Sequence, residues 1–445
     1  MKGRAELPAS STKRIGEANK QLVLNEVRMR ERASVDELVR HTRRSHPTVM
    51  KWLGVLERDG YLMRWGFGES RGGRPPTLYR FNARREYLLG LAVEIPAVQA
   101  ALIDLNGEVL VGDAWKLGSH LPAEALQDQL ADRVETFLSS AGVPREKLAG
   151  CGVVLSGFVD QKAGLSLASP RLADWRDVPV RDFLAARLNT QVILNHHIDA
   201  LTLAELSCGV AKGWRDFVYF DVGHGLGVRL VHAGQPLQGV FGNAGLIGHT
   251  TVVPDGRRCL CGNTGCLEEY VSVRAWLRQL ADDPGSAKSP QEAGDADGLA
   301  ARTFQLGANG GARLQRRKAQ TLKFLAIGVA NAVNVFDMPR VVVSGFVAHG
   351  GAEFREELTA VVKARLQPPL SSALEIVYAS VPRTQAGARG AALFALKHRL
   401  PEAEPLLIKA QAPAEGGEPL PADAFAEPAA VTWNGEVEPT ASRRS

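Results

Sequence analysis

The sequence predicts an α/β protein whose body has mixed sheets in two lobes, preceded by a small basic module of helices with one β-hairpin. Three observations predict this fold class. From residue 85 to residue 400, short apolar strands alternate with helical stretches. The order of a hairpin followed by a helix recurs within this body, which indicates two related halves. The first 90 residues instead show helix, turn, helix spacing and carry 19 Lys and Arg against 10 Asp and Glu, a net charge of +9.

Charge and composition narrow the class of protein. The 445 residues have a formal net charge of +5, so the part after position 90 has a net charge of −4. A basic module suggests a polyanionic partner such as DNA, with a merely solvated surface as the alternative. The hydrophobic content of 45% is ordinary for a soluble globular protein. We found no bilayer-spanning apolar run and no signal-peptide segment, so we expect a cytoplasmic protein without a membrane partner.

Three helices are predicted in the N-terminal module. Residues 19–32 carry apolar side chains at roughly helical spacing. Ser34 and Glu37 have the spacing of a capping box, which opens a second helix. Ser45 can cap a third helix, which Gly60 ends. The apolar positions on one face of this third helix point to a core: Val49, Leu53 and Leu56. This spacing is typical of proteins that lay a recognition helix in the major groove of DNA.

Two alternating segments, "YLMRWG" and "TLYRFN", follow as the strands of a hairpin with the long tip "FGESRGGRPP". The cationic tip could enter a minor groove, whose negative potential attracts arginine. We therefore expect residues 1–84 to be a winged helix-turn-helix domain that binds double-stranded DNA, with a small protein-binding helical domain as the alternative. The predicted DNA contacts are Arg43, Arg44, Ser45, His46, Thr48 and Lys51 around the third helix, and Arg71, Gly72, Gly73 and Arg74 in the tip.

The body is expected over residues 85–400, with a ligand bound in the cleft between its lobes. Its strands include "LAGCGVVLSGFV", "TQVIL", "FVYFDVGHGLGVRLVHAG" and "RVVVSG". Helices are expected at residues 123–141, 180–188, 200–211, 319–333 and 352–366. Residues 282–298 are predicted to form a loop. Residues 401–445 contain 7 prolines, 8 acidic and 3 basic residues, which predicts a disordered tail.

The strongest chemical signal is "HTTVVPDGRRCLCGNTGCLEEY", residues 249–270. Cys259, Cys261 and Cys266 have C-x-C-x4-C spacing, and His249 lies ten positions before the first cysteine. Three thiolates and one imidazole can satisfy tetrahedral Zn²⁺, and four protein ligands make a closed, structural site. A disulfide and free thiols with an unrelated histidine are the alternatives. The crowding of three thiols in a cytoplasmic chain favours zinc.

At this cluster the chain resembles the ROK family, which contains repressors and sugar kinases. The family motif C-x-C-G-x-x-G-C-x-E matches from Cys259 to Glu268, and the resemblance covers nearly all of residues 15–400. It includes "GGRPP", "NGEVL", "SPRLADW", "GHGLG", "NAGLIGH", "VVVSG" and "RGAA". The resemblance implies a two-lobed, actin-like ATPase body with a sugar site in the cleft. It also implies the N-terminal winged helix of the repressor members.

The same resemblance implies that kinase chemistry is lost. Family kinases carry E-N-D-A-N-A-A-A-L-A-E, where this chain reads "NHHIDALTLAE", so His197 replaces the catalytic Asp and His196 replaces an Asn. The first phosphate loop, D-x-G-G-T in the family, begins here at Glu94 and contains Pro96, which has no N–H to donate. His224 replaces a usual Thr in the second phosphate loop. Phosphoryl transfer needs phosphate cradles, a metal and a base together, so we expect no kinase activity.

The sugar pocket is altered too. Leu246 replaces the Glu of the family's A-G-E-x-G-H, and Arg171 lies where an Asn often contacts sugar. The residues expected to contact an effector are Arg171, His196, His197, His249 and Glu268. The cleft binds either a different ligand or none. A second metal site at the paired histidines is a weaker reading, because adjacent residues at a strand end point apart.

The leading interpretation is a DNA-binding transcriptional regulator, most simply a repressor of carbohydrate-related genes. The resemblance implies a homodimer or a dimer of dimers on a two-fold operator, with a sugar or sugar-derived effector and structural Zn²⁺. The alternatives are an ATP-dependent sugar kinase with a DNA-binding appendage, and a scaffold protein with a helical N-terminus.

Overall fold

A computed structural model describes residues 9–69, 74–94, 96–118, 121–169, 172–240, 242–281, 296–306 and 311–400. Several predictions fall outside these residues: the tip residues Arg71, Gly72 and Gly73, the pocket residue Arg171, most of the loop at 282–298, and the tail at 401–445.

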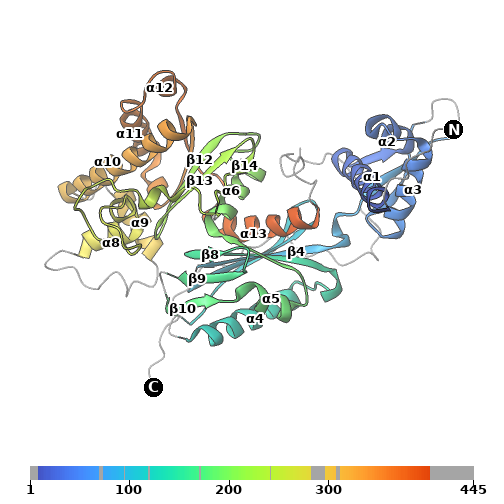
Figure 1. Cartoon of the computed structure of the whole chain (residues 1–445), viewed down its shortest axis with the longest axis horizontal. Helices are drawn as coiled ribbons and strands as arrows, with labels where there is room; N and C mark the ends of the chain where they lie inside the picture. The colour runs from blue at the N-terminus through green and yellow to red at the C-terminus, as the bar shows by residue number, and fades with distance from the viewer. Residues whose placement is uncertain are drawn as a thin grey trace.

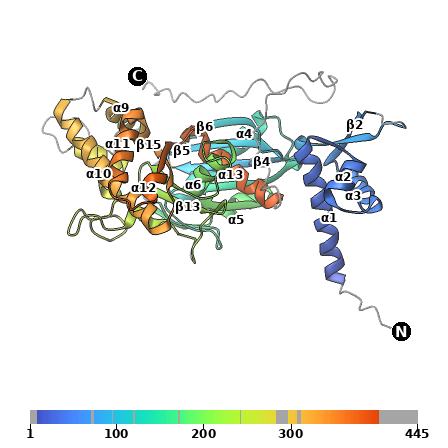
Figure 2. The same cartoon turned by 90° about the horizontal axis from the view of Figure 1, so that it is seen from above.

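The N-terminal module contains three helices and three short strands, and it projects from one end of the body (Figure 1, Figure 2). The elements are α1 (Ala9–Arg30), β1 (Arg32–Ser34), α2 (Val35–Thr42), α3 (His46–Arg58), β2 (Leu62–Phe67) and β3 (Thr77–Phe81). The strands pair antiparallel in the order β1-β3-β2. This order places a hairpin directly after the third helix, as the alternating sequence pattern predicted.

Local sequence signals explain how these helices start and stop. Ser34 and Glu37 form the predicted capping box at α2. At α3 the prediction was partly wrong, because the Ser45 hydroxyl bonds the hydroxyl of Thr48 at 2.8 Å and makes no capping bond to a backbone N–H. Gly60, with φ +78°, follows the end of α3 as predicted. The apolar face of α3 is buried as predicted, at Val49, Leu53 and Leu56.

The N-terminal lobe is a five-stranded sheet in the order β11-β7-β4-β5-β6. Its strands are β4 (Tyr87–Glu94), β5 (Ala97–Asp104), β6 (Val109–Lys116), β7 (Leu148–Leu155) and β11 (Val192–His196). Its helices α4 (Ala123–Ser140) and α5 (Val180–Leu188) match the predicted ranges closely. A small sheet of β8 (Phe158–Asp160), β9 (Leu165–Ser169) and β10 (Leu172–Val178) lies beside it.

The C-terminal lobe repeats this sheet order as β14-β13-β12-β15-β16. The strands are β12 (Phe217–Val222), β13 (Leu226–His232), β14 (Gln235–Pro236), β15 (Arg340–Gly345) and β16 (Glu375–Tyr378). In both lobes, the first strand is antiparallel to the second and parallel to the fourth. The predicted two related halves are therefore present. The other helices of the body, of which α13 packs on the N-terminal lobe, are α6 (His197–Cys208), α7 (Glu268–Val271), α8 (Val273–Ala281), α9 (Ala296–Gln305), α10 (Gly311–Phe336), α11 (Gly351–Lys363), α12 (Leu370–Ala373) and α13 (Arg383–Arg399).

Several helix boundaries differ from the sequence prediction, among them the start of α1, expected at residue 19 and found at Ala9, and the end of α11, expected at residue 366 and found at Lys363. The helix expected at 200–211 is α6, which begins three residues earlier because His196 has the extended backbone of an N-cap and Asp199 favours the first turn. The helix expected at 319–333 is α10, whose first turns are mostly polar and contain one large apolar residue, Leu314, so that they show no clear amphipathic pattern. Residues 296–298, expected in a loop, begin α9.

Two long helices have notable packing. α10 is long and apolar enough to cross a membrane by length and composition, but half of its most apolar stretch is buried within the protein, as in a soluble core helix. α13, drawn in orange-red in Figure 1, packs on β4, β7 and α6. A Cβ atom added at Gly90 or Gly152 would lie within 2 Å of a backbone oxygen of α13, so glycine is required for this close contact.

Candidate functional site

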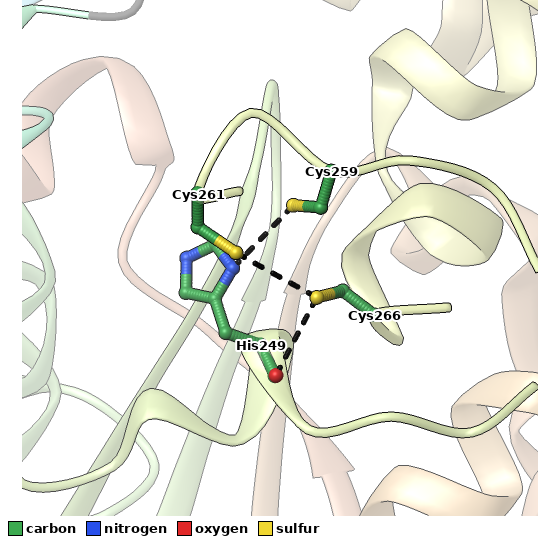
Figure 3. Close-up of side chains that lie close together, drawn as sticks. All are labelled: His249, Cys259, Cys261 and Cys266. Atoms are coloured by element: carbon green, nitrogen blue, oxygen red, sulfur yellow. Dashed lines mark hydrogen bonds between the residues drawn. The ribbon is translucent and has the colours of Figure 1, made fainter. Parts of the chain in front are cut away.

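The cysteine cluster consists of His249, Cys259, Cys261 and Cys266, whose ligand atoms all lie within 4.8 Å of one another (Figure 3). The Nδ1 atom of His249 is 3.6 Å from the Sγ atom of Cys259, and the Sγ atoms of Cys261 and Cys266 are 3.7 Å apart. Cys259 and Cys266 are buried, whereas Cys261 is exposed. The four residues predicted as metal ligands therefore converge on one point.

A tight loop brings these donors together. Gly262 and Gly265 have φ values of +93° and +76°, which side-chain-bearing residues rarely adopt. A Cβ atom at Gly265 would lie 1.8 Å from the carbonyl oxygen of Val253. The Asn263 side chain donates to the Sγ atom of Cys266 at 3.4 Å and to the carbonyl oxygen of His249 at 3.3 Å, which ties the loop to the histidine.

The donor set fits a divalent metal ion. Three sulfurs and one imidazole nitrogen at these separations correspond to the corners of a tetrahedron around Zn²⁺. Burial is the largest cause that raises the pKa of the Cys259 thiol to about 12, and the neighbouring thiols contribute to the increase. The cluster could hold a metal through its four side chains, with no further position left open to a substrate.

A second cluster of charged side chains joins the two lobes, and we call it the junction network. It consists of Glu94 at the end of β4, Asp221 in β12 and Arg383 at the start of α13. The Arg383 guanidinium donates to Glu94 at 2.9 Å and to Asp221 at 3.2 Å. Ser344 of β15 also donates to Asp221, at 2.8 Å. One half-buried arginine thus pairs with a carboxylate from each lobe.

His197 lies beside the junction network. Its Nε2 atom is 3.0 Å from an Oε atom of Glu94, and its side chain is only 6% exposed. A Cβ atom added at Gly387 of α13 would lie 2.8 Å from the same nitrogen. His197 is thus a buried partner of Glu94 at the first residue of α6.

His196 lies beside a different buried pair of charged residues, Asp199 and Arg229, which we call the Asp199 cluster. Asp199 of α6 and Arg229 of β13 form an ion pair at 2.5 Å, with side chains only 2% and 3% exposed. Gln161 also contacts Asp199, at 3.5 Å. Burial raises the pKa of Asp199 to about 6, although Arg229 acts to lower it. Burial also lowers the pKa of His196 to about 4, so its imidazole is neutral at pH 7.

The other predicted pocket residues are distributed differently. Glu268 accepts a hydrogen bond from the backbone N–H of Leu226 at 2.8 Å and one from Arg274 at 3.3 Å. Leu246 is exposed. The structure therefore separates the expected effector residues. His249 is in the cysteine cluster and Glu268 lies beside it, within 4.8 Å of Cys259. His197 lies beside the junction network, and His196 lies beside the Asp199 cluster.

The predicted DNA contacts that the structure describes lie just before α3, in its first turns, and, for Arg74, three residues before β3. Arg43, Arg44, Ser45, His46, Lys51 and Arg74 are exposed, and Thr48 is half-buried. Arg44 donates to the side chain of Asn19 in α1 at 2.7 Å. The Lys51 ammonium lies 4.9 Å from the ring centre of Trp52.

Sequence reasoning missed Arg383, Arg229 and Asp199. For Arg229 there was a signal: one charged residue within the apolar strand "LGVRLVH" indicates a buried ion pair. For Arg383 we find no such signal, because its partners lie 162 and 289 residues away.

Comparison with known proteins agrees with this architecture. The family model "ROK family" matches residues 90–398. The xylose repressor of Bacillus spizizenii is 25% identical over 387 residues, which cover 87% of this chain and 97% of the repressor. A glucokinase of Streptomyces coelicolor is 27% identical over 270 residues, which cover 59% of this chain and 83% of the kinase. A crystal structure of a ROK family transcriptional regulator, homologous to the Escherichia coli protein MLC, superposes with a TM-score of 0.72 at 22% identity, covering 88% of this chain and 98% of that one. With more than half of its length matched by the family model, the chain belongs to the ROK family.

Proposed function

We propose that this chain is a DNA-binding, sugar-responsive transcriptional repressor without kinase activity. One observation carries the proposal: the match to a xylose repressor covers 87% of the chain, whereas the match to a glucokinase covers 59%. The repressor match of 387 residues is longer than the kinase match of 270 residues by more than the 84 residues of the N-terminal module. A kinase needs no such module, but a repressor needs a part that binds its operator.

The module is suited to duplex DNA. In our proposal residues 1–84 are a winged helix-turn-helix domain and residues 85–400 are the effector-binding and dimerising body. The start of α3 presents exposed His46 and Lys51 next to Arg43 and Arg44, which is a cationic surface of the size that a major groove accepts. Arg74, exposed at the base of the wing tip, would add a backbone or minor-groove contact.

The junction network supports the absence of kinase activity. It lies next to Pro96 and Gly223, where the resemblance puts the two phosphate loops. Arg383 approaches within 3.1 Å of the position that a Cβ atom on Gly223 would take. Glu94, the counterpart of the family's phosphate-loop Asp, already pairs with Arg383 and His197. The carboxylates that could hold a magnesium ion are therefore engaged by the protein's own side chains.

We propose that the effector is a sugar or a sugar-derived molecule, bound near the Asp199 cluster. An open pocket of about 490 Å³ borders this cluster and is lined in part by Gln161 and Asn195. Gln161 also contacts Asp199, which makes it a link between pocket and cluster. Within this proposal, Gln161 and Asn195 are polar contacts in the pocket and His196 is the next residue after Asn195, while the engaged side chains of His197 and Glu268 position the surrounding backbone.

We also propose that the protein works as a homodimer or a dimer of dimers. We further propose that it works in the cytoplasm and that the cysteine cluster holds structural Zn²⁺. The reducing conditions of the cytoplasm keep the thiols available to a metal. A closed four-ligand site stabilises the loop between β14 and α7 and supplies no open position for catalysis.

Selection of genomic DNA fragments by the purified full chain tests the function. We expect recovery of sites near carbohydrate genes, with an affinity that falls steeply as salt concentration rises. The Lys51→Ala and Arg74→Ala variants should each reduce the slope of log Kd against log salt by about 1 if the residue contacts a phosphate. Glu356→Ala, a change on the exposed face of α11, is the matched control and should leave the slope unchanged.

Two outcomes would contradict the proposal. One is a failure to retain any fragment above background at low salt. The other is ATP-dependent phosphorylation of a pentose or hexose that His197→Ala abolishes, because that result would favour the sugar-kinase alternative.

A further inference from the structure

The β2–β3 hairpin of the N-terminal module has an exposed apolar face. Met63 and Trp65 of β2 are each 37% exposed, and Phe67, further along the same strand, is 65% exposed. Met63 lies opposite Arg80 of β3 in the strand register, and the Arg80 guanidinium lies 4.2 Å from the centre of the Trp65 ring. The two strands therefore present Met63, Trp65 and Arg80 on one face of the hairpin, and we call these three residues the wing face.

The wing face is not part of the module's core. The core contains the opposite face of the hairpin, where Leu62, Tyr79 and Phe81 are buried in one apolar cluster. Among the described residues, β2 pairs only with β3, so it is an edge strand. Exposed apolar side chains gathered beside a strand edge are typical of a surface that another chain segment covers. Because Arg80 lies among them, a segment that is both apolar and acidic fits this face best.

The end of α13 brings the chain to this hairpin. Arg399, the last residue of the helix, donates a hydrogen bond to the hydroxyl of Tyr61, which directly precedes β2. Leu400 is buried in the same apolar cluster as Leu62. Trp65 lies four residues after Tyr61, which is about 13 Å along an extended strand. The chain that follows Leu400 therefore starts within a short distance of the wing face.

The sequence after Leu400 has the chemistry that this face requires. It begins "PEAEPLLIK", with acidic side chains at Glu402 and Glu404 and three adjacent large apolar side chains at residues 406–408. Six extended residues span at most about 20 Å, so residue 406 can reach the wing face from Leu400. Residues 401–445 as a whole contain 8 acidic and 3 basic residues, whereas the first 90 residues have a net charge of +9. Reach, hydrophobicity and charge thus all favour the same segment.

We propose that residues 402–408 dock on the wing face of the same molecule, with the apolar residues 406–408 against Met63 and Trp65 and the two glutamates next to Arg80. A short tether gives an effective concentration on the order of 1 mM, so even a weak contact is populated. DNA would contact Arg80 but offers little apolar surface to Met63 and Trp65. A docked segment would compete with DNA for the wing, and this regulatory use rests on the proposed function, whereas the docking itself does not.

Hydroxyl-radical footprinting of the full chain, read by mass spectrometry, tests the docking without DNA. Met50 of α3 is the internal reference, because its side chain is 42% exposed against 37% for Met63 and both belong to the same module. Without docking, the two methionines should be oxidised at similar rates. We expect Met63 to be oxidised at least about threefold more slowly than Met50, which corresponds to a Kd below half of the effective concentration.

A substitution in the docking segment should remove this protection. We expect oxidation of Met63 and Trp65 to become at least about threefold faster, with Met50 unchanged, in the triple variant Leu406→Ser, Leu407→Ser and Ile408→Ser. The matched control makes three adjacent serine substitutions further along the chain and should leave all three rates unchanged: Ala424→Ser, Phe425→Ser and Ala426→Ser. Neither variant alters the net charge, so a difference between them reports the apolar contact.

Three results would overturn the proposal. Equal oxidation of Met63 and Met50 in the parent would show that the wing face is uncovered, and this comparison needs no variant. An equal effect of both triple variants would show that residues 406–408 are not the docking segment. Protection of Met63 that increases with protein concentration would show that a second copy covers the face. A failure to bind DNA would contradict the proposed function alone, because none of these oxidation rates depends on DNA.

Discussion

The cysteine cluster and the junction network are both gatherings of ionisable side chains, and they are satisfied in opposite ways. In the cysteine cluster, three thiols and an imidazole converge, and each can act as a metal ligand. In the junction network, two carboxylates that could hold a cation already flank the guanidinium of Arg383. The nearby Asp199 is likewise paired with Arg229.

Whether the donors already have a cation of their own determines which chemistry each region supports. A set of donors without a cation of its own gains stability when a metal arrives. A set whose carboxylates are already paired with an arginine of the same chain gains less from a metal, and it holds the surrounding elements in place instead.

Removal of the metal from the cysteine cluster should have the largest effect. We expect Cys266→Ser to lose one equivalent of bound zinc and more than about 5 kcal/mol of unfolding free energy, because a structural metal site contributes its binding energy to folding. Elemental analysis and urea unfolding measure both. Cys208→Ser, which changes a thiol outside the cluster, should keep its zinc. A fully stable Cys266→Ser protein would show that the loop needs no metal.

Next is the buried ion pair. Arg229→Met should lower the unfolding free energy by about 3–5 kcal/mol at pH 7, because it leaves the Asp199 carboxylate buried without its partner. The double variant with Asp199→Asn should recover at least half of that loss, as measured by urea unfolding. A loss below about 1 kcal/mol in the single variant would mean that the pair is not desolvated in solution.

The His196 side chain should give a smaller, pH-dependent effect. Its pKa is lowered by burial to about 4 from an ordinary 6.5, so the fold favours the neutral imidazole. Its contribution is complete above pH 6.5 and is lost as the pH falls toward 4. The unfolding free energy of the parent relative to His196→Gln should therefore decrease by about 3 kcal/mol between pH 7 and pH 4. A pH-independent difference would contradict the burial of this ring.

The smallest effect is expected at an exposed arginine. Arg187 of α5 pairs with Asp132 of α4 at 2.8 Å, but its side chain is 37% exposed. Arg187→Gln should change the unfolding free energy by less than about 1 kcal/mol, since water screens such pairs. A loss as large as that of Arg229→Met would show that burial does not explain the difference between the two arginines.

The sequence predicts the cysteine cluster better than the junction network, and chain distance explains why. Three of the four donors lie within eight residues, so a local motif is enough to identify them. Glu94 and Arg383 lie 289 residues apart and meet only because α13 returns to the first sheet. The two-lobe fold and most helices follow from periodicity, whereas the start of α6 at His197 depended on capping geometry that the apolar pattern does not contain.

In our proposal, the carboxylates at the lobe junction are paired with Arg383, and the junction does not accept a nucleotide. Calorimetric titration of ATP with Mg²⁺ into the full chain tests this claim most directly. We expect no heat beyond that of dilution at millimolar nucleotide. Saturable binding with a Kd below about 1 mM would contradict it.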